Sequence, residues 1–259
     1  MTGPSSIQGF YRYSANCKIK SIILMGKMTP TTVKAITLDL DDTLWPIWPT
    51  IQRAEQHLYN WMSQRAPATA ATTSLEGLRA LRQQVETAHP QWKHDLSAYR
   101  REAIRLALRQ AGDDESLTEE GFSVFFEARQ QVDLFDDALP ALRRLSARYP
   151  LIALSNGNSD LQRMGLKHYF QAAVSAQNFG VSKPDKRIFH EAARVSGQNA
   201  ADILHVGDDL QLDVSGALQA GMQTAWVVRG PAQQNTGSQD VQPQYTVTDL
   251  LQLCDALGC

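Results

Sequence analysis

The chain has 259 residues, of which 43% are hydrophobic and 20% are charged, and its formal net charge at pH 7 is −2. This length allows a full apolar core in one large domain or two smaller ones. The slightly acidic balance, without a basic run, argues against a nucleic-acid partner. The longest apolar run near the start, residues 22–25, is too short for a membrane span or a signal segment.

The beginning of the chain and its cysteines point to a protein inside the cell. Residues 1–32 show little periodicity and contain several Ser, Gly and Pro, so we expect a mobile tail, with Met28 as an alternative start. Cys17, Cys254 and Cys259 lack the spacing of metal ligands. Few cysteines and no predicted disulfide favour the reducing cytoplasm. We expect no membrane partner, and either a monomer or a homodimer.

Residues 33–40 are apolar or β-branched except for Lys34 and Asp39, which predicts a buried parallel strand. Asp39 and Asp41 are two residues apart, so their carboxylates would project to the same side at the carboxyl end of this strand. Their repulsion requires a cation between them or two separated pKa values. Mg²⁺ suits such oxygen ligands. The alternative is a cluster that only forms a turn or caps a helix.

The remaining pattern predicts an α/β fold. Residues 45–49 contain two tryptophans and two prolines and indicate a hinge, after which four helices are expected at 51–66, 74–87, 95–110 and 118–131. Strands and helices then alternate: helix 137–148, strand 150–155, helix 159–167, strand 172–175, helix 185–196, strand 202–207, helix 213–220, strand 223–228, a loop over 229–246 and helix 247–257. This order predicts a doubly wound, mainly parallel, Rossmann-like sheet. The core would comprise 33–47 and 132–259, with an all-helical cap inserted at 48–131.

Further polar residues occur where the later strands end or helices begin. Ser155 ends the second strand, Lys183 precedes a helix, Asp208 follows a strand, and Asp213 starts the next helix. Taken singly, Ser155 and Asp213 could each cap a helix, and Lys183 could be a solvated surface lysine. Asp209 remains ambiguous.

The ordered set resembles the four motifs of the haloacid dehalogenase-like hydrolases: a D-x-D-x-T strand end, a strand-end Ser, a Lys before a helix and a G-D-x4-D strand end. The resemblance implies that Asp39 is a nucleophile forming an aspartyl-phosphate, and that Asp41 acts first as acid and then as base. Ser155 would hold a phosphoryl oxygen, and Lys183 would neutralise charge.

The same resemblance implies a Mg²⁺ ion that offsets the repulsion between a carboxylate and a phosphate monoester. Asp39, Asp208 and the backbone carbonyl of Asp41 would hold the ion, and Asp213 would orient Lys183 or metal-bound water. The phosphoryl group would also be bound by residues near these motifs, namely Leu40, Thr43 and Asn156.

The helical insertion resembles the C1-type cap of this family, which excludes water and also a folded protein, so a small phosphate ester is the expected substrate. Residues 81–101, 155–158 and 205–226 resemble the bacterial phosphatases of flavin mononucleotide and of the riboflavin precursor 5-amino-6-(5-phospho-D-ribitylamino)uracil. Five residues could contact the aromatic ring and the ribityl chain of such a substrate, namely Trp45, Trp48, Tyr99, Arg100 and Arg101. The alternative is packing for the aromatic residues and a solvated helix face for the arginines.

Other functions on the same fold stay open. A phosphatase for phosphoglycolate, a nucleotide or a sugar phosphate, or a sugar-phosphate mutase, would carry the same motifs. A 2-haloacid dehalogenase needs neither the acid at Asp41 nor the metal. A non-catalytic binding protein would have little reason to keep Asp39 and Asp41 side by side.

Overall fold

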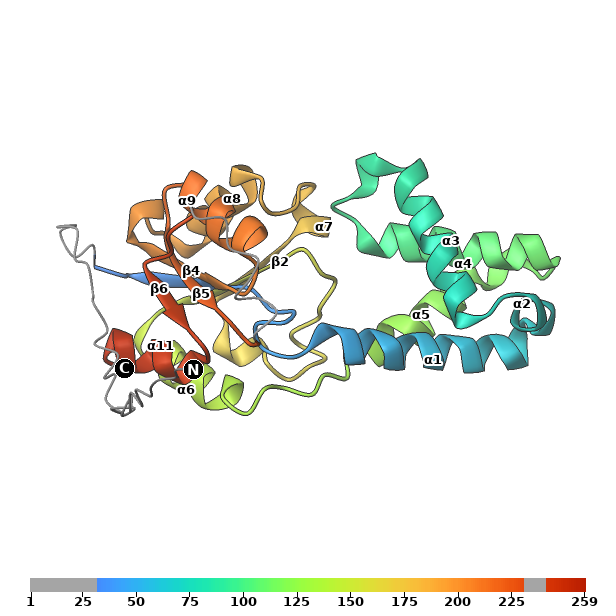
Figure 1. The fold of residues 1–259 in the computed structure, drawn as a ribbon, viewed down its shortest axis with the longest axis horizontal. Helices are drawn as coiled ribbons and strands as arrows, with labels where there is room; N and C mark the ends of the chain where they lie inside the picture. The colour runs from blue at the N-terminus through green and yellow to red at the C-terminus, as the bar shows by residue number, and fades with distance from the viewer. Residues whose placement is uncertain (1–31, 231–240) are drawn as a thin grey trace, which may run out of the picture. The chain divides into compact units, whose positions relative to one another are not determined.

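The computed structural model describes residues 32–230 and 241–259 (Figure 1). Residues 1–31, with Cys17 and Met28, lie outside this part, and so does most of the predicted tail. The described residues form a six-stranded parallel sheet in the order β3-β2-β1-β4-β5-β6. The strands are β1 (Ala35–Leu38), β2 (Leu151–Ser155), β3 (Ala172–Ser175), β4 (Ile203–Gly207), β5 (Gln223–Val227) and β6 (Tyr245–Val247). The predicted fold class, a doubly wound parallel sheet, is confirmed.

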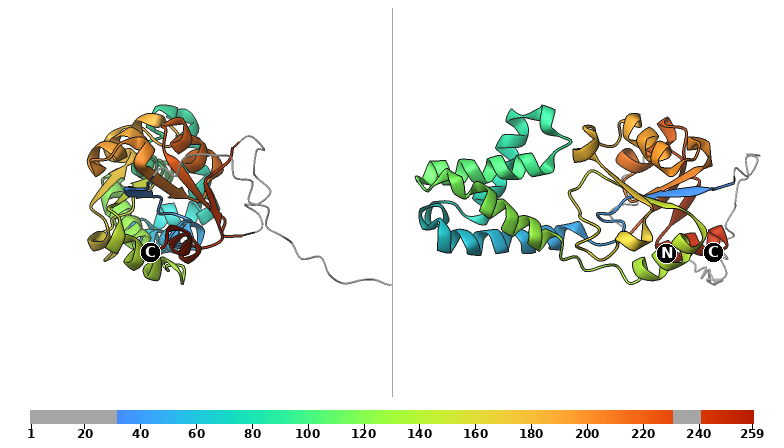
Figure 2. Two further views of the ribbon diagram at one scale, coloured as in Figure 1. Left: turned by 90° about the vertical axis from the view of Figure 1, so that its left-hand side faces the viewer. Right: turned by 180° about the vertical axis from the view of Figure 1, so that it is seen from behind.

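Helices cover both faces of the sheet, as Figures 1 and 2 show. On one face, α6 (Ala138–Arg148) and α11 (Leu250–Leu257) pack against strand residues such as Ile36 and Leu38. On the other face, α8 (Lys186–Ser196) and α9 (Gly216–Gln219) pack against residues such as Ile152 and Leu154. Because successive strand residues point to opposite faces, a strand buried on both sides is apolar at almost every position.

The three central strands end together. Leu38 of β1 pairs with Ala153 of β2 on one side and with Val206 of β4 on the other. Residues that end or directly follow these strands are therefore brought to one edge of the sheet. This register places Asp39, Ser155 and Asp208 in one neighbourhood.

A second apolar cluster lies within the helical insertion. It is built by residues such as Leu58, Met62, Ile104 and Leu108, all of which are almost completely buried. The helices of this part are α1 (Ile47–Arg65), α2 (Pro67–Thr72), α3 (Leu75–Ala88), α4 (Leu96–Ala111) and α5 (Thr118–Arg129). Apart from Ile47, which begins α1 one residue earlier, they fall within the predicted cap, whose boundaries at 48 and 131 remain a prediction.

Several predicted elements differ from the structure. The expected helix 159–167 is wrong: residues 161–165 form turns, and the single turn closed by the Met164 amide on the Asp160 carbonyl ends at Gly165, which adopts a left-handed φ of 72°. The helix expected from Asp213 begins earlier, and the strand β6 lies at the end of a predicted loop. Helix α2 begins at Pro67, between the first two predicted helices, because proline is favoured at the first helical position.

The remaining short elements are η1 (Pro90–Trp92), η2 (Glu115–Leu117), η3 (Lys167–Tyr169), α7 (Ala176–Phe179), η4 (Ala200–Asp202) and the π-helical turn η5 (Leu210–Ser215). Among residues 32–230 and 241–259, no helix combines the length and the apolar character that crossing a membrane would require.

Candidate active site

The first polar cluster is formed by the turn that follows β1. Asp39 is 6% exposed, and Thr43 donates a hydrogen bond to its Oδ2 at 3.1 Å. Thr43 also lies 3.3 Å from Oδ1 of Asp208 and can donate to that oxygen instead. Asp42 adopts a left-handed φ of 60° and accepts from the amide of Ile47, which reverses the chain sharply into α1. This turn presents Asp39 and Asp41 at the end of the strand.

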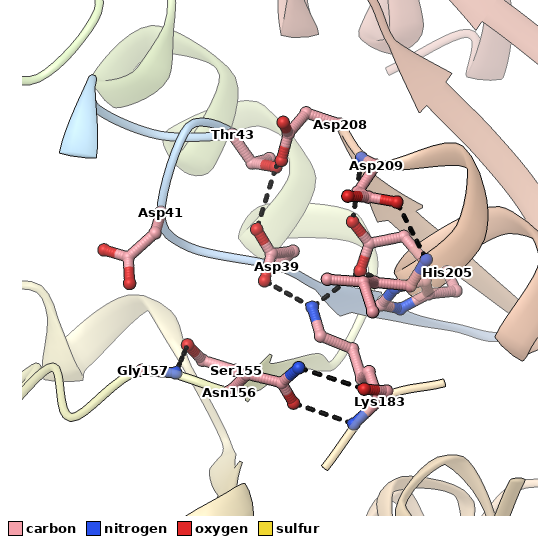
Figure 3. A network of polar contacts seen from close by, with 12 residues as sticks. Asp39, Asp41, Thr43, Ser155, Asn156, Gly157, Lys183, His205, Asp208 and Asp209 are labelled. Atoms are coloured by element: carbon pink, nitrogen blue, oxygen red, sulfur yellow. Dashed lines mark hydrogen bonds and ion pairs between the residues drawn. The ribbon is translucent and has the colours of Figure 1, made fainter. Parts of the chain in front are cut away.

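Lys183 places a buried ammonium group against the first carboxylate (Figure 3). Its Nζ lies 2.5 Å from Oδ1 of Asp39 and 2.6 Å from Oδ1 of Asp213. Burial disfavours the charged ammonium, but Asp213 and Asp39 outweigh it and hold the pKa of Lys183 above its ordinary value. Asn156 fixes the lysine backbone, since its side chain accepts from the Lys183 amide at 2.7 Å and donates to the Lys183 carbonyl at 3.1 Å.

Asp213 is the centre of a buried network behind the lysine. His205 Nε2 lies 3.1 Å from its Oδ1, and the other ring nitrogen of His205 lies 2.8 Å from Thr37 Oγ1. Burial opposes ionisation, but Lys183 and His205 hold the pKa of Asp213 below its usual range. Gly207 allows this approach, because a Cβ there would lie 2.3 Å from the Asp213 carboxylate carbon.

The helix-capping alternative for Asp213 is not the arrangement observed. Asp209, which the sequence left ambiguous, is the capping residue. Its Oδ1 accepts from the amides of Gln211 and Leu212 at 2.7 and 2.9 Å. Asp213 instead accepts from Lys183, as an orienting role for that lysine would require.

Three carboxylates could together hold a metal ion. Oxygen atoms of Asp39, Asp208 and Asp213 lie within 4.8 Å of one another. Burial, followed by charge from other carboxylates, raises the pKa of Asp39 to about 7 and that of Asp208 to about 8. An all-oxygen set that resists ionisation in this way fits a hard divalent cation such as Mg²⁺. Lys183 and His205 already satisfy one Asp213 oxygen, so Asp39 and Asp208 are the better donors.

Asp41 is held apart from this cluster by two nitrogen donors. Trp45 Nε1 donates to its Oδ1 at 2.9 Å, and Nη2 of Arg129 lies 2.7 and 2.8 Å from the two oxygens. Gly157 borders the same carboxylate, since a Cβ there would lie 2.4 Å from Oδ2 of Asp41. Arg129 is not among the predicted site residues, because an arginine at the end of a helix belongs to none of the motifs.

A pocket of about 170 Å³ opens between these groups. Ser155 lines it and accepts a hydrogen bond from the Gly157 amide at 2.9 Å, so the proton of its own hydroxyl can be donated to a ligand oxygen. The volume suits a phosphoryl group more than a large ring. The other lining residues are Asp39, Asp41, Asp42, Asn156, Gly157, Lys183, Asp208, Asp209, Leu212 and Asp213. Leu40 and Thr43 are buried beside the turn and are not part of the lining.

Most of the residues predicted to contact the substrate from the hinge and the cap bind other protein residues instead. Trp45 is completely buried with its N–H on Asp41, which corrects the expectation that it meets a substrate. Arg100 is 3% exposed and both of its terminal nitrogens lie 3.2 Å from Glu55, so it too belongs to the helical core.

Two further cap candidates also have protein partners. Arg101 pairs with Glu119 at the surface and stacks on Phe122, with the guanidinium carbon 3.6 Å from the ring centroid. Tyr99 is buried and donates its hydroxyl to the His89 carbonyl. Trp48 differs from the other four, since 53% of its surface is exposed.

The family follows from sequence comparison. Residues 33–221 match the model of the haloacid dehalogenase-like hydrolases. The chain belongs to this family. Among its relatives, the 5-amino-6-(5-phospho-D-ribitylamino)uracil phosphatase YigB of Escherichia coli is 34% identical to this chain over 199 residues. The matched region covers 75% of this chain and 83% of that protein.

Other relatives of this hydrolase carry different names. A glyceraldehyde 3-phosphate phosphatase of Methanopyrus kandleri is 29% identical over 213 residues, covering 78% of this chain and 86% of the relative. A crystal structure described as a 2-haloacid dehalogenase from Pseudomonas syringae pv. Tomato DC3000 is 36% identical and superposes with a TM-score of 0.80. It covers 88% of this chain and 99% of that one. The predicted family and fold are thus confirmed.

Proposed function

We propose that this hydrolase cleaves phosphate monoesters of small molecules in two steps, with Asp39 as the nucleophile. The observation that carries the proposal is that a second carboxylate, Asp41, lines the same pocket as Asp39 and Lys183. A phosphatase of this type needs both an attacking carboxylate and an acid for the leaving alkoxide. The family and its phosphatase relatives support the same reaction class.

The oxygens of Asp39 and Asp208, with the backbone carbonyl of Asp41, would hold Mg²⁺. Bound there, the ion would supply positive charge to the reacting phosphoryl oxygens. The raised pKa values of Asp39 and Asp208 support this assignment, because burial and mutual repulsion leave both carboxylates short of compensating charge.

In the first step, an Asp39 oxygen forms a bond to phosphorus while the bond from phosphorus to the ester oxygen breaks. Asp41 gives its proton to the departing alkoxide. Lys183 and Ser155 bind the phosphoryl oxygens as their charge shifts, and Asn156 keeps the lysine backbone in place.

In the second step, the same residues remove the phosphoryl group from the protein. Asp41, now ionised, takes a proton from a water molecule, whose oxygen forms a bond to phosphorus. The bond from phosphorus to Asp39 then breaks and releases phosphate. Phosphoryl transfer depends mainly on position and charge, and the buried, hydrogen-bonded cluster at the sheet edge would supply both.

The second candidate is hydrolytic dehalogenation of a 2-haloacid, because a structure described in this way is 36% identical to the chain. That reaction would also use the Asp39 carboxylate, but it displaces a halide that needs no proton donor. The dehalogenation reaction would give no chemical role to the carboxylates of Asp41 and Asp208. The geometry therefore favours the phosphatase.

For the substrate, we propose flavin mononucleotide or 5-amino-6-(5-phospho-D-ribitylamino)uracil, which would place the reaction in riboflavin synthesis in the cytoplasm. The similarity to the Escherichia coli enzyme supports this choice. Of the five candidate residues, Trp48 is the one whose ring is largely exposed and so open to a substrate ring, and its ring centroid lies 5.2 Å from the guanidinium carbon of Arg79.

The test is phosphate release with Mg²⁺ from flavin mononucleotide, the ribitylaminouracil phosphate, phosphoglycolate, a pyrimidine nucleotide and a sugar phosphate, compared as kcat/KM. Halide release from 2-chloropropionate is measured in parallel, and Asp39→Asn controls for contaminating phosphatases. The proposal requires the two flavin-related esters to lead, and Trp48→Ala to reduce that lead with little effect on 4-nitrophenyl phosphate. Halide release without phosphate release would establish the dehalogenase, and phosphoryl return to a sugar product would establish a mutase.

A further inference from the structure

Arg129 is a buried arginine that belongs to the end of α5 and yet reaches the first motif. It is 1% exposed, and its Nη2 contacts both oxygens of Asp41 at 2.7 and 2.8 Å. Its Nε donates to Oδ1 of Asn158 at 2.9 Å, and Asn158 in turn donates to Ser97. A buried guanidinium is costly unless it is paired, so the position of Arg129 depends on the Asp41 carboxylate.

The two oxygens of Asp41 are not equivalent. Oδ1 accepts from Nε1 of Trp45 at 2.9 Å as well as from Arg129, so two donors occupy it. Oδ2 accepts only from Arg129 among the described residues. It is also the oxygen next to Gly157, which lines the phosphoryl pocket beside Ser155.

The donors of Asp41 come from the two crossings between the sheet and the helical insertion. Trp45 lies just before α1, and Arg129 is the last residue of α5. The Asp41 carboxylate cannot rotate about its Cβ–Cγ bond without breaking its hydrogen bond to Trp45 or its hydrogen bonds to Arg129. The orientation of Asp41 is therefore set by the helical insertion as well as by β1.

We propose that Arg129 is a positioning residue for Asp41. Together with Trp45 it keeps Oδ1 as an acceptor and presents Oδ2 to the phosphoryl pocket as the oxygen that gives and takes the proton. The inference rests on the proposed phosphatase reaction. In its first step Oδ2–H passes its proton to the leaving alkoxide as the ester bond breaks, and in its second step Oδ2 accepts a proton from the attacking water.

The test uses the dependence of kcat/KM on the leaving group. This parameter covers the reaction only up to departure of the alcohol, so hydrolysis of the aspartyl-phosphate does not enter it. A primary alkyl phosphate needs a proton at its leaving oxygen, whereas 4-nitrophenyl phosphate has a stable leaving anion and needs little help. Loss of position at Asp41 should therefore affect the alkyl ester selectively.

We expect Arg129→Gln to lower kcat/KM for the alkyl ester by at least about 100-fold, the lower range of general acid catalysis, and for the aryl ester by less than about 10-fold. Arg129→Lys, which keeps a donor and a charge, should recover part of the alkyl activity. In an Asp41→Asn background, Arg129→Gln should cause no further selective loss, since the residue acts through Asp41.

The matched control is Arg53→Gln. Arg53 also ties a helix of the insertion to the second crossing, through Asp133 at 2.7 Å and the Gln131 carbonyl at 2.6 Å, but it does not touch Asp41. It should change both esters equally and slightly. The proposal would be overturned if Arg53→Gln lowered kcat/KM for the alkyl ester as selectively as Arg129→Gln does. Loosening the second crossing alone would then explain the loss, without any contact to Asp41.

The remaining outcomes also decide the matter. Equal losses for both esters in Arg129→Gln and Arg129→Lys would overturn the positioning role and assign Arg129 to the common phosphoryl group or to folding, which thermal unfolding of each variant separates. If Asp41→Asn is selective for the alkyl ester and Arg129→Gln is not, only the inference on Arg129 fails. If Asp41→Asn itself affects both esters equally, the acid role proposed for Asp41 fails, and the inference fails with it.

Discussion

Replacing Asp39 by Asn should abolish turnover and at the same time stabilise the ion-free protein at alkaline pH. Asn preserves the shape of the side chain but cannot attack phosphorus, so kcat should fall by several orders of magnitude. The effect on stability has the opposite sign, because Asp39 is buried beside other carboxylates and its pKa is raised from 3.8 to about 7.

The magnitude follows from this shift. One pKa unit corresponds to about 1.4 kcal/mol, so ionising Asp39 at pH 8 costs the folded state about 4 kcal/mol relative to the unfolded chain. Because the pKa is raised on folding, the stability that the protonated carboxyl allows is complete below pH 4 and is lost as the pH rises through 7. Asn carries no charge at any pH. Its advantage should be about 2–4 kcal/mol at pH 8 and should shrink below about 2 kcal/mol at pH 5.

Urea unfolding in EDTA, at several pH values between 5 and 8, measures this difference directly. The control is Asp202→Asn, which removes a partly exposed carboxylate paired with Lys34 and should change stability by less than about 1 kcal/mol without a pH trend. If Asp39→Asn is no more stable than the natural protein at pH 8, or if the two curves run parallel, the reasoning about buried charge is wrong. Retained turnover would refute the nucleophile.

Three further outcomes are expected. EDTA should abolish phosphate release and Mg²⁺ should restore it, and Mg²⁺ should raise the unfolding midpoint more at pH 8 than at pH 5; activity that persists in chelator would contradict a metal site. Gly207→Ala should lower stability by about 1–3 kcal/mol and reduce kcat, since the new Cβ would displace the Asp213 carboxylate; unchanged unfolding and turnover would show that the strand yields. Glu55→Ala should cost about 3–5 kcal/mol in urea unfolding by leaving the Arg100 charge buried, and a loss below about 1 kcal/mol would count against a desolvated pair.

The parts of the fold that the sequence predicts well are those set by local pattern. Strands buried on both faces, such as 151–155 and 203–207, read as apolar runs of about their true length. The helix expected at 159–167 stops after about one turn, because Gly165 adopts a left-handed φ of 72°. A glycine of this kind is a local stop signal, which hydrophobic periodicity alone does not reveal.

The candidate site divides in the same way. The strand-end residues Asp39, Ser155 and Asp208 could be predicted, because parallel strands bring their carboxyl ends together. Arg129 could not be predicted, since its role depends on where α5 ends in space. Arg100 was predicted to contact the substrate, because it belongs to a polar helix. It is instead buried in the helical core, where it pairs with Glu55.

The charges of the site explain why catalysis needs more than the residues themselves. Oxygen atoms of Asp39, Asp208 and Asp213 lie within 4.8 Å of one another, and the ammonium of Lys183 lies within 2.6 Å of Asp39 and Asp213. A phosphate monoester would bring further negative charge to this cluster, and the guanidinium of Arg129 is already bound to Asp41. Repulsion between close charges grows as water is excluded. A divalent cation between Asp39 and Asp208 would offset it, so the crowding of carboxylates that raises the pKa values of Asp39 and Asp208 is also what would bind metal and ester together.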